Sequence, residues 1–196
     1  MSHAALEPGL FALIRSDLEA TARLKGVRFP SAGAYVDLLT IPGVWAVLLF
    51  RVAHFCHTHS LRPLSRLCYF ANVVLFGADL APGARVGPGL AIAHPVFCGW
   101  GSELEMGSNV ILTGGVRFGT AARPDKKGHP RVGNDVFFLD AAKVLGGVEI
   151  GDGALIASNA LVLDDVPPLA IVVGQPARVV RYRDESEVGS GDLGEV

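Results

Sequence analysis

From Leu80 onward, a medium-sized apolar residue recurs at every sixth position of the chain. One run is Leu80, Val86, Ile92, Cys98, Leu104, Val110 and Val116, and a second is Val132, Phe138, Val144, Ile150, Ile156 and Val162. Neither a helix, with its period of 3.6, nor a strand, with its period of two, produces this spacing. A triangular parallel β-helix does, because each hexad forms one flat face and one corner and directs its apolar residue inward. The pattern therefore predicts a prism of short parallel strands over residues 78–182.

The segment before the prism has a helical pattern. Apolar residues with helical spacing occur near residues 10–24, 44–57 and 63–76, and Pro42 and Pro63 suit the first turns of the last two stretches. These two stretches are apolar on nearly all sides, so we expect them to pack on each other, on the end of the prism or on another copy of the chain. The predicted fold class is α+β, with an N-terminal helical region (1–77) followed by the β-helix domain (78–182).

Two further segments depart from the six-residue pattern. Residues 119–130, GTAARPDKKGHP, are polar and rich in turn formers, which predicts an extruded loop of the kind that carries function on a rigid scaffold. Residues 183–196 are acidic and rich in glycine, which predicts a disordered tail. A flat prism face with exposed aliphatic residues would be covered by self-association, so we expect a homotrimer with threefold closure.

Composition narrows the class of protein. Half of the 196 residues are apolar and 18% are charged, which excludes disorder for most of the chain. The net charge is −2 with no basic block, so a nucleic-acid surface is not expected. The three cysteines show no metal-binding or disulfide spacing, and we find no secretion signal and no apolar stretch that would span a bilayer. These features predict a cytoplasmic protein without a metal.

Two of the six histidines fall on the prism part of the chain. His94 lies at a corner among apolar neighbours, where a neutral imidazole can act as a base, and Asp79 precedes it by fifteen residues, on a neighbouring rung. His129 belongs to the extruded loop. His54 and His57 lie at a predicted helix end without a third metal ligand nearby, so we interpret them as polar helix-end residues.

Several motifs spread over residues 43–180 are those of a known family. They are PGVWAVLLFRVAHF before the prism, GADLAPGARVGPGL at its start, AHP at the corner, the GVRFGT and KGHPRVG ends of the loop, AAKVLGGVEIGDGALIASNALVLDDVPP, and the closing VVGQPARVVR. Together they resemble the serine acetyltransferases, hexapeptide-repeat enzymes with a left-handed β-helix that transfer an acetyl group from acetyl-CoA to serine.

The resemblance implies a role for individual residues. His94 matches the general base of the family, Asp79 the acid that orients it, and His129 the loop histidine that contacts the acceptor. The co-substrate is acetyl-CoA or another acyl-CoA, which in this family lies between adjacent prisms. The matching positions here are Gly119, Thr120, Asp140, Ala141, Ala157, Ser158 and Arg178, with Lys126 and Lys127 as alternative phosphate contacts.

The acceptor part of the family pattern is altered in this chain. Ala93 stands where the family carries the aspartate that holds the ammonium of serine, and Gly128 stands where it carries the arginine that holds the carboxylate. Phe97, Cys98 and Trp100 replace small residues, and Phe97 and Trp100 are candidates to contact a larger acceptor. A zwitterion without its counter-charges binds poorly. We therefore expect an acyltransferase whose acceptor, a hydroxyl or an amine of a glycan or biosynthetic intermediate, is not free serine.

Three alternatives remain open at this point. An ordinary serine acetyltransferase of cysteine biosynthesis would need other residues, such as Lys127 and Asp37, to supply the missing charges. A zinc hydratase of the γ-carbonic-anhydrase type shares the prism but needs three histidines, and the prism part supplies only His94 and His129. The third alternative is a catalytically inactive trimeric scaffold.

Overall fold

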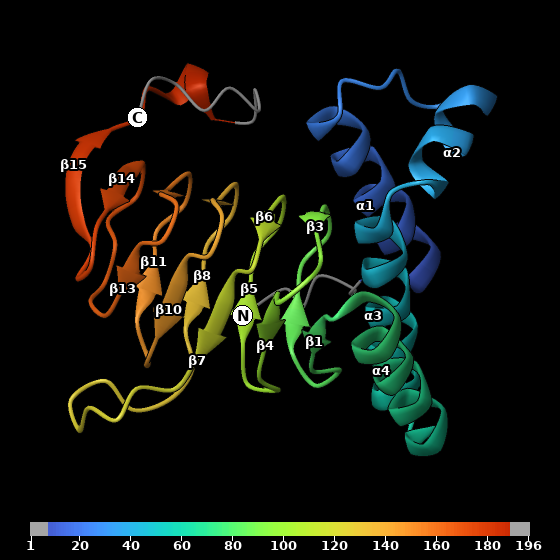
Figure 1. Ribbon diagram of the computed structural model, residues 1–196, viewed down its shortest axis with the longest axis horizontal. Coiled ribbons are helices and arrows are strands. Elements are labelled where there is room, and N and C mark those ends of the chain that lie inside the picture. Colours follow the sequence, from blue (N-terminus) through green and yellow to red (C-terminus); the bar gives the residue numbers. More distant parts are fainter. Residues whose placement is uncertain (1–7, 189–196) are drawn as a thin grey trace, which may run out of the picture.

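The computed structural model of the chain describes residues 8–188, in which a cap of helices covers one end of a triangular prism (Figure 1). The helices are α1 (Leu10–Leu24), α2 (Ala32–Leu39), α3 (Pro42–Thr58) and α4 (Arg62–Phe76). Three of them confirm the helical segments predicted from the sequence. Helix α2 was not predicted; it begins after Ser31, whose side-chain oxygen accepts a hydrogen bond from the Ala34 N–H at 3.1 Å.

The prism has three faces, each a sheet of short strands. Face A contains β1 (Asp79–Leu80), β4 (Gly99–Trp100), β7 (Arg117–Gly119), β10 (Lys143–Leu145) and β13 (Leu161–Val162). Face B contains β2 (Arg85–Val86), β5 (Glu105–Met106), β8 (Arg131–Val132) and β11 (Glu149–Ile150). Face C contains β3 (Ala91–His94), β6 (Ile111–Gly114), β9 (Phe137–Phe138), β12 (Leu155–Ile156), β14 (Ala170–Val173) and β15 (Arg178–Tyr182).

Every strand pair within these sheets is parallel except β14–β15, an antiparallel hairpin that closes the far end. From β1 to β13, successive strands belong to different faces, and paired strands are three positions apart along the chain. At the far end, β12 pairs with β14. The predicted parallel β-helix is therefore confirmed. The final hairpin was not predicted, because its residues follow the last position of the six-residue pattern.

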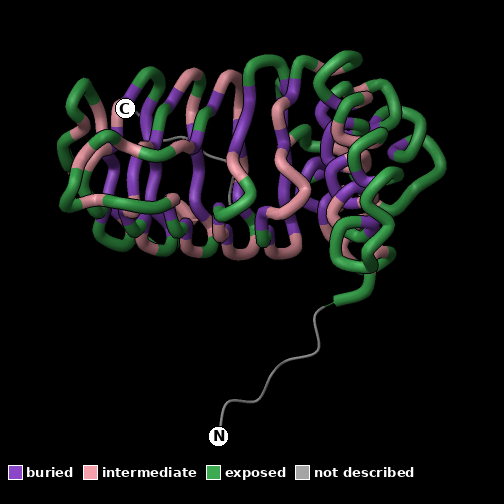
Figure 2. The backbone as a smooth tube through the Cα atoms, turned by 90° about the horizontal axis from the view of Figure 1, so that it is seen from below, coloured by how far each residue is buried: buried purple, intermediate pink, exposed green. Residues whose placement is uncertain are grey.

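The residues of that pattern belong to the core of the prism, whose strands are largely coloured as buried in Figure 2. All thirteen have a relative exposure of 9% or less, and Ile92, Cys98, Leu104, Val116, Phe138, Val144 and Ile156 are fully buried. The Phe118 and Phe138 rings meet edge to face, with centroids 5.0 Å apart. The six-residue repeat thus specifies the core directly.

A buried ion pair joins the helical cap to the first coil. The Arg51 guanidinium on α3 donates from Nε to Asp17 Oδ2 on α1 at 2.7 Å and to the carbonyls of Val86 and Gly87 at 2.6 Å each. The Asp17 carboxylate in turn accepts the backbone N–H of Gly89 at 3.0 Å. Because both charges are satisfied by hydrogen bonds, this network fixes the orientation of α1 and α3 on the prism.

Residues 183–188 fold back on the last coil, so this part of the predicted disordered tail is ordered. Residues 183–188 include the 3-10 helix Glu185–Glu187, and the backbone N–H of the buried Arg183 donates to the Leu169 carbonyl at 2.7 Å. The rest of the tail predicted over 183–196 lies outside the described residues. None of the described helices is by itself long and apolar enough to cross a membrane, and only the bent pair α2 and α3, which meet at 87°, has the required length and composition.

Candidate active site

The edge between faces C and A carries several of the predicted functional residues. The chain turns this corner once per coil, and hydrogen bonds between successive corners stack His94, Gly114, Asp140 and Ser158 in consecutive rungs. The Ala141 N–H donates to the Gly114 carbonyl at 2.7 Å, and the Asn159 N–H donates to the Asp140 carbonyl at 2.8 Å. We call this column the His94 edge.

Gly114 brings two polar side chains together on the His94 edge. A Cβ atom at this glycine would lie 3.1 Å from Asp140 Oδ1 and 3.2 Å from His94 Cβ. His94 and Asp140 therefore flank the same rung, and the missing side chain leaves a notch between them. Both residues are exposed, and within the described residues neither the His94 ring nor the Asp140 carboxylate has a hydrogen-bond partner.

Asp79, the predicted partner of His94, is engaged by other groups. Its Oδ1 accepts a hydrogen bond from the Tyr69 hydroxyl at 2.6 Å, and its Oδ2 lies 3.8 Å from Arg117 Nη2. This hydrogen bond, together with burial, raises the pKa of Tyr69 above its ordinary value. In residues 8–188, no hydrogen bond or ion pair connects Asp79 with His94. The sequence spacing placed the two residues on neighbouring rungs but gave no direction for the carboxylate.

His129 lies at a different edge of the prism from His94. Its Nδ1 is 3.1 Å from Glu103 Oε2, and its Nε2 would be 2.6 Å from a Cβ atom at Gly101, so the ring rests on this glycine. Gly101 follows β4, whereas the His94 corner precedes β4. Within one chain, the two histidines are therefore separated by the width of face A.

Gly128, beside His129, adopts a backbone conformation that excludes most side chains. Its φ is +105°, a value that L residues rarely adopt. An arginine at position 128 would therefore be strained by this backbone conformation, although no atom lies within 4 Å of a Cβ built there.

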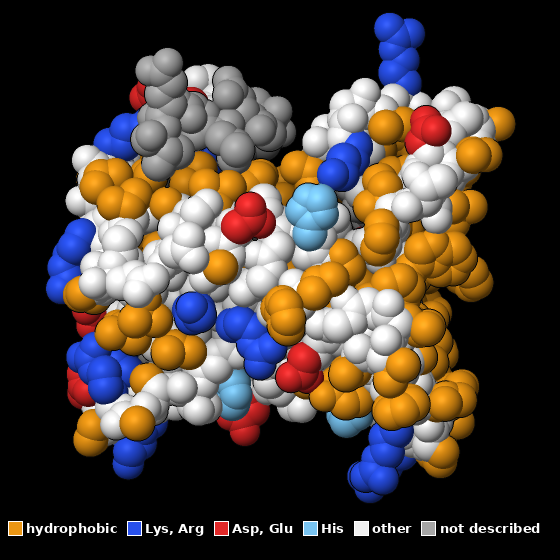
Figure 3. All heavy atoms as spheres, in the orientation of Figure 1, with side chains coloured by type: hydrophobic (Ala, Val, Ile, Leu, Met, Phe, Trp, Pro, Cys, Tyr) orange, Lys and Arg blue, Asp and Glu red, His pale blue; other side chains and the backbone are white. Residues whose placement is uncertain are grey.

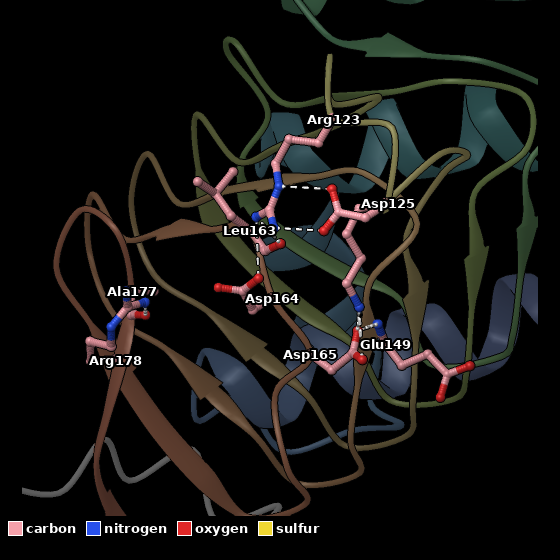
Figure 4. A network of polar contacts seen from close by, with 9 residues as sticks. Arg123, Asp125, Glu149, Leu163, Asp164, Asp165, Ala177 and Arg178 are labelled. Carbon is pink, nitrogen blue, oxygen red and sulfur yellow. Dashed lines mark hydrogen bonds and ion pairs between the residues drawn. The ribbon is translucent and has the colours of Figure 1, made fainter.

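Ion pairs tie the extruded loop to the turn that follows β13 (Figure 4). Lys126 Nζ donates to both carboxylate oxygens of Asp165 at 2.8 and 2.9 Å, and Arg123 Nη1 lies 3.2 Å from Asp164 Oδ1. The hydrogen bond from Lys126 is the main reason that the pKa of Asp165 is lowered. Lys126 is therefore occupied by Asp165, whereas the sequence proposed it as a phosphate contact.

The predicted CoA-binding residues divide between two places. Asp140, Ala141, Ala157 and Ser158 belong to the His94 edge, and Gly119 and Thr120 lie at the other end of face A, where the loop begins. Arg178 is exposed on β15, apart from the loop network, and its Nη1 donates to the Ala177 carbonyl at 2.7 Å (Figure 4).

The aromatic residues near the corner have different positions. Phe97 is 74% exposed with a φ of +63°, next to the His94 corner, where it can meet a ligand. Trp100, predicted as a second acceptor contact, is only 4% exposed and packs edge to face on Phe50, with centroids 5.1 Å apart. We correct that prediction: Trp100 points into the core because it occupies an inward position of β4, and it takes no part in the site.

Two residues near the predicted site residues, Gly114 and Arg117, were not singled out from the sequence. Gly114 resembled any other corner glycine, and Arg117 resembled a solvated charge on a strand. Arg117 lies across Gly99, because a Cβ atom at that glycine would be 3.1 Å from Arg117 Nη1. The register of β4 with β7, which pairs Gly99 with Arg117, is the signal that could have revealed this contact. Across residues 8–188, no group of three or more His, Cys, Asp or Glu side chains has the arrangement of a metal site.

A β-helix prism with a histidine corner and an extruded loop is typical of the hexapeptide-repeat class of acyltransferases. No family model matches the chain. A serine acetyltransferase of Mycobacterium tuberculosis is 34% identical over 180 residues, which cover 91% of this chain and 77% of the relative.

The chain is also similar to solved structures of serine acetyltransferases. The Neisseria gonorrhoeae serine acetyltransferase in complex with serine is 29% identical, with a TM-score of 0.76, over 88% of this chain and 69% of that one. A serine acetyltransferase in complex with CoA is 28% identical, with a TM-score of 0.77, over 87% and 69% of the two chains. The chain belongs to the serine acetyltransferase family. It is an acyl-CoA-dependent O-acyltransferase of the left-handed β-helix fold family, as the resemblance implied, with acetyl-CoA as its co-substrate.

Proposed function

We propose that the protein transfers the acetyl group of acetyl-CoA to the hydroxyl of serine, with His94 as the general base. The observation that carries this proposal is the relationship to serine acetyltransferases, one of which has been solved in complex with serine. The expectation of an acceptor other than serine is not supported by these relatives. The alternative stated from the sequence, serine O-acetylation, is better supported.

The chemistry requires one base at the acceptor hydroxyl. His94 Nδ1 or Nε2 accepts the hydroxyl proton while the oxygen attacks the thioester carbonyl of acetyl-CoA. The tetrahedral intermediate then expels the thiolate of CoA, which takes the proton from the imidazolium, so that O-acetylserine and CoA leave. The exposed, unpartnered ring of His94 supports this role because a substrate can reach it.

In this proposal, Asp79 does not orient the base, which is the role that the resemblance implied for it. Its carboxylate holds Tyr69 by a 2.6 Å hydrogen bond and lies 3.8 Å from Arg117. Asp79 is therefore a positioning residue for the groups around the corner, and it does not contact the base directly.

CoA would lie along the His94 edge, toward Arg178. The small residues Ala141, Ala157 and Ser158 permit close approach of the pantetheine arm, and the exposed Arg178 guanidinium can meet a phosphate. Gly119 and Thr120, at the opposite end of face A, would contact this CoA from an adjacent copy of the chain.

A homotrimer with active sites between adjacent subunits accounts for the separation of the two histidines. Because His94 and His129 lie at different edges of one prism, a site that holds both needs the edge of one copy and the loop of another. We also propose a cytoplasmic location, as expected from the sequence.

A steady-state assay of CoA release tests the acceptor. With acetyl-CoA saturating, we expect serine to be used with a kcat/KM of about 10⁴ M⁻¹s⁻¹ or more, in the ordinary range for enzymes. The His94→Ala protein, with an unchanged circular-dichroism spectrum, should lose this turnover. Efficient acetylation of a sugar or of another hydroxyl compound, with serine inert, would contradict the proposal.

A further inference from the structure

His129, at the end of the extruded loop, is held by the turn that follows β4. Its Nδ1 lies 3.1 Å from Glu103 Oε2, and the Nε2 side of its ring rests on Gly101, where a Cβ atom would lie 2.6 Å from Nε2. The His129 side chain is 19% exposed, against 77% for that of Glu103. The ring is thus enclosed on two sides, which restricts the edges that a ligand can meet.

The backbone brings Glu103 and His129 together independently of their side chains. Strand β5 pairs with β8 so that Glu105 lies opposite Arg131. Glu103 and His129 each come two residues earlier, so they occupy equivalent places on neighbouring rungs. The turn that carries Glu103 is closed by a backbone hydrogen bond of 3.3 Å to the Gly101 carbonyl. The contact is therefore built into the prism and does not depend on the long loop alone.

Glu105, the next carboxylate along the chain, is engaged by other groups. Its Oε1 lies 3.3 Å from Arg85 Nη1, and its Oε2 lies 3.5 Å from Arg131 Nε. In the described part of the chain, His129 is the only hydrogen-bond or ion-pair partner of the Glu103 side chain. The Glu103 carboxylate therefore serves the imidazole alone.

A pocket beside the ring gives a ligand access to His129. Its volume is about 290 Å³, and Glu103, Lys127, His129 and Arg131 are among the residues that line it. Within residues 8–188, Nε2 of the ring has no hydrogen-bond partner. A polar group that enters this pocket can therefore meet the imidazole.

A carboxylate next to an imidazole determines which ring nitrogen carries the proton. Because a carboxylate only accepts hydrogen bonds, the nitrogen that faces it is the one that donates. The other nitrogen is then left for a substrate, as in the Asp–His pairs that orient a functional histidine. His129 has such a partner in Glu103, whereas no hydrogen bond connects Asp79 with His94 in residues 8–188.

We infer that Glu103 is the positioning residue of the loop histidine: its carboxylate keeps the proton of His129 on Nδ1, so that the neutral ring offers Nε2 to the acceptor. This inference rests on the proposed function, in which His129 belongs to a site shared between two copies of the chain. Glu103 acts through the imidazole and does not itself touch the acceptor. Gly101 is part of the same arrangement, because a side chain there would displace the ring.

Nitrogen NMR of the histidine rings tests the proton position without any turnover. In the wild-type protein, the signals of His129, assigned by their loss in His129→Ala, should show the neutral ring protonated on Nδ1. Glu103→Met, which removes both acceptor oxygens, should shift the ring toward the Nε2–H form. The control is Glu19→Met, which removes a carboxylate paired with Arg15 on α1 and should leave the ring unchanged. A wild-type ring protonated on Nε2 would overturn the inference.

The kinetics should follow the ring. Glu103→Met, with an unchanged circular-dichroism spectrum, should lower kcat/KM for serine about 10- to 100-fold and change KM for acetyl-CoA less than about twofold, the range typical of partners that orient a liganding histidine. Glu103→Asp, which keeps a carboxylate on a shorter side chain, should recover part of the loss. Gly101→Ala should lower the same value with Glu103 intact, because its Cβ atom would lie 2.6 Å from Nε2.

Two kinetic results would overturn the inference. One is a kcat/KM for serine that is unchanged in Glu103→Met. The other is a loss of turnover without a change in the proton position of His129, which would mean that Glu103 contacts the acceptor directly. A wild-type protein that does not acetylate serine would instead refute the proposed function, and the NMR experiment would still decide whether Glu103 fixes the ring.

Discussion

At the scale of single residues, the spacing between His94 and Asp140 depends on the missing side chain of Gly114. We expect Gly114→Ala to raise KM for the acceptor several-fold, because its new Cβ atom would enter the notch at 3.1 to 3.2 Å from both neighbours. Steady-state kinetics and a thermal melt together check this. Gly33→Ala is the control, because a Cβ atom there meets nothing within 4 Å; it should leave KM unchanged and should not lower the melting temperature, since alanine suits the α2 helix at least as well as glycine. An unchanged KM in Gly114→Ala would show that the notch is not used.

Residue positions were only partly predictable from the sequence. His94 was found because it follows an inward position of the repeat and lies in a family motif. Trp100 was misplaced because its bulk suggested a ligand contact, although Phe50 from α3 receives it in the core. The neighbours of Asp79 and Arg117 depend on side-chain directions across rungs, which the period of the repeat does not determine.

At the scale of elements, one buried arginine, Arg51, contributes to the contact between helices and prism, beside the apolar residues of α3 that pack on the prism core. Arg51→Met would leave the Asp17 carboxylate buried without its cation, and removing one partner of such a pair costs about 3 to 5 kcal/mol of unfolding free energy. Thermal unfolding followed by circular dichroism at a fixed protein concentration measures the loss. The control is Arg85→Met, whose side chain is 79% exposed and which should change stability little. Equal stability of the two variants would contradict a structural role for Arg51.

The ion pair between Lys126 and Asp165, which we call the loop tether, holds the extruded loop on the turn after β13 and gives a second prediction at this scale. Asp165→Asn should speed tryptic cleavage within residues 119–130 by about two- to fivefold, since an exposed ion pair contributes at most about 1 kcal/mol. Limited proteolysis at neutral pH measures the rate, with Asp37→Asn as the control. A rate no faster than that of the control would show that Asp165 does not hold the loop.

The pH dependence of this tether follows from the direction of the pKa shift. Because the hydrogen bond from Lys126 lowers the pKa of Asp165 below its ordinary value of 3.8, the tether is fully present above that pH. It weakens only as the pH falls through the lowered pKa. Loop cleavage by an acid protease should therefore accelerate below pH 3.8, and acceleration already at pH 5 to 6 would contradict this.

The elements themselves were largely predictable. The six-residue spacing specified the prism because each hexad makes one complete structural unit, so a local pattern determines a global fold. Helix α2 was not predicted, because the stability of this eight-residue helix depends on the Ser31 cap and on packing against α3. The β14–β15 hairpin depends on contacts that only the finished prism offers.

At the scale of the whole molecule, a single chain exposes a broad apolar surface over its helices (Figure 3). On α4, Leu67 is 62% exposed, Phe70 63% and Leu75 67%, and Phe97 on the adjacent corner is 74% exposed. Isolated soluble chains rarely leave so much contiguous apolar surface uncovered. This surface supports the proposed self-association.

A shared active site makes a strong prediction for mixed assemblies. If His94 of one copy and His129 of the next build one site, the inactive His94→Ala and His129→Ala proteins should regain activity when they are dissociated and reassembled together. Some interfaces in the mixture then contain both intact histidines. Light scattering should give the mass of a trimer or a multiple of it. A mixture as inactive as its components would place each site within one chain.

Direct detection of the product tests the central claim, that the His94 edge transfers an acetyl group to serine. Wild-type protein incubated with acetyl-labelled acetyl-CoA and serine should yield labelled O-acetylserine by mass spectrometry, and His94→Ala with the same circular-dichroism spectrum should yield about 10² to 10⁴ times less. Labelled product at an equal rate from both proteins, or none from the wild type, would contradict the account.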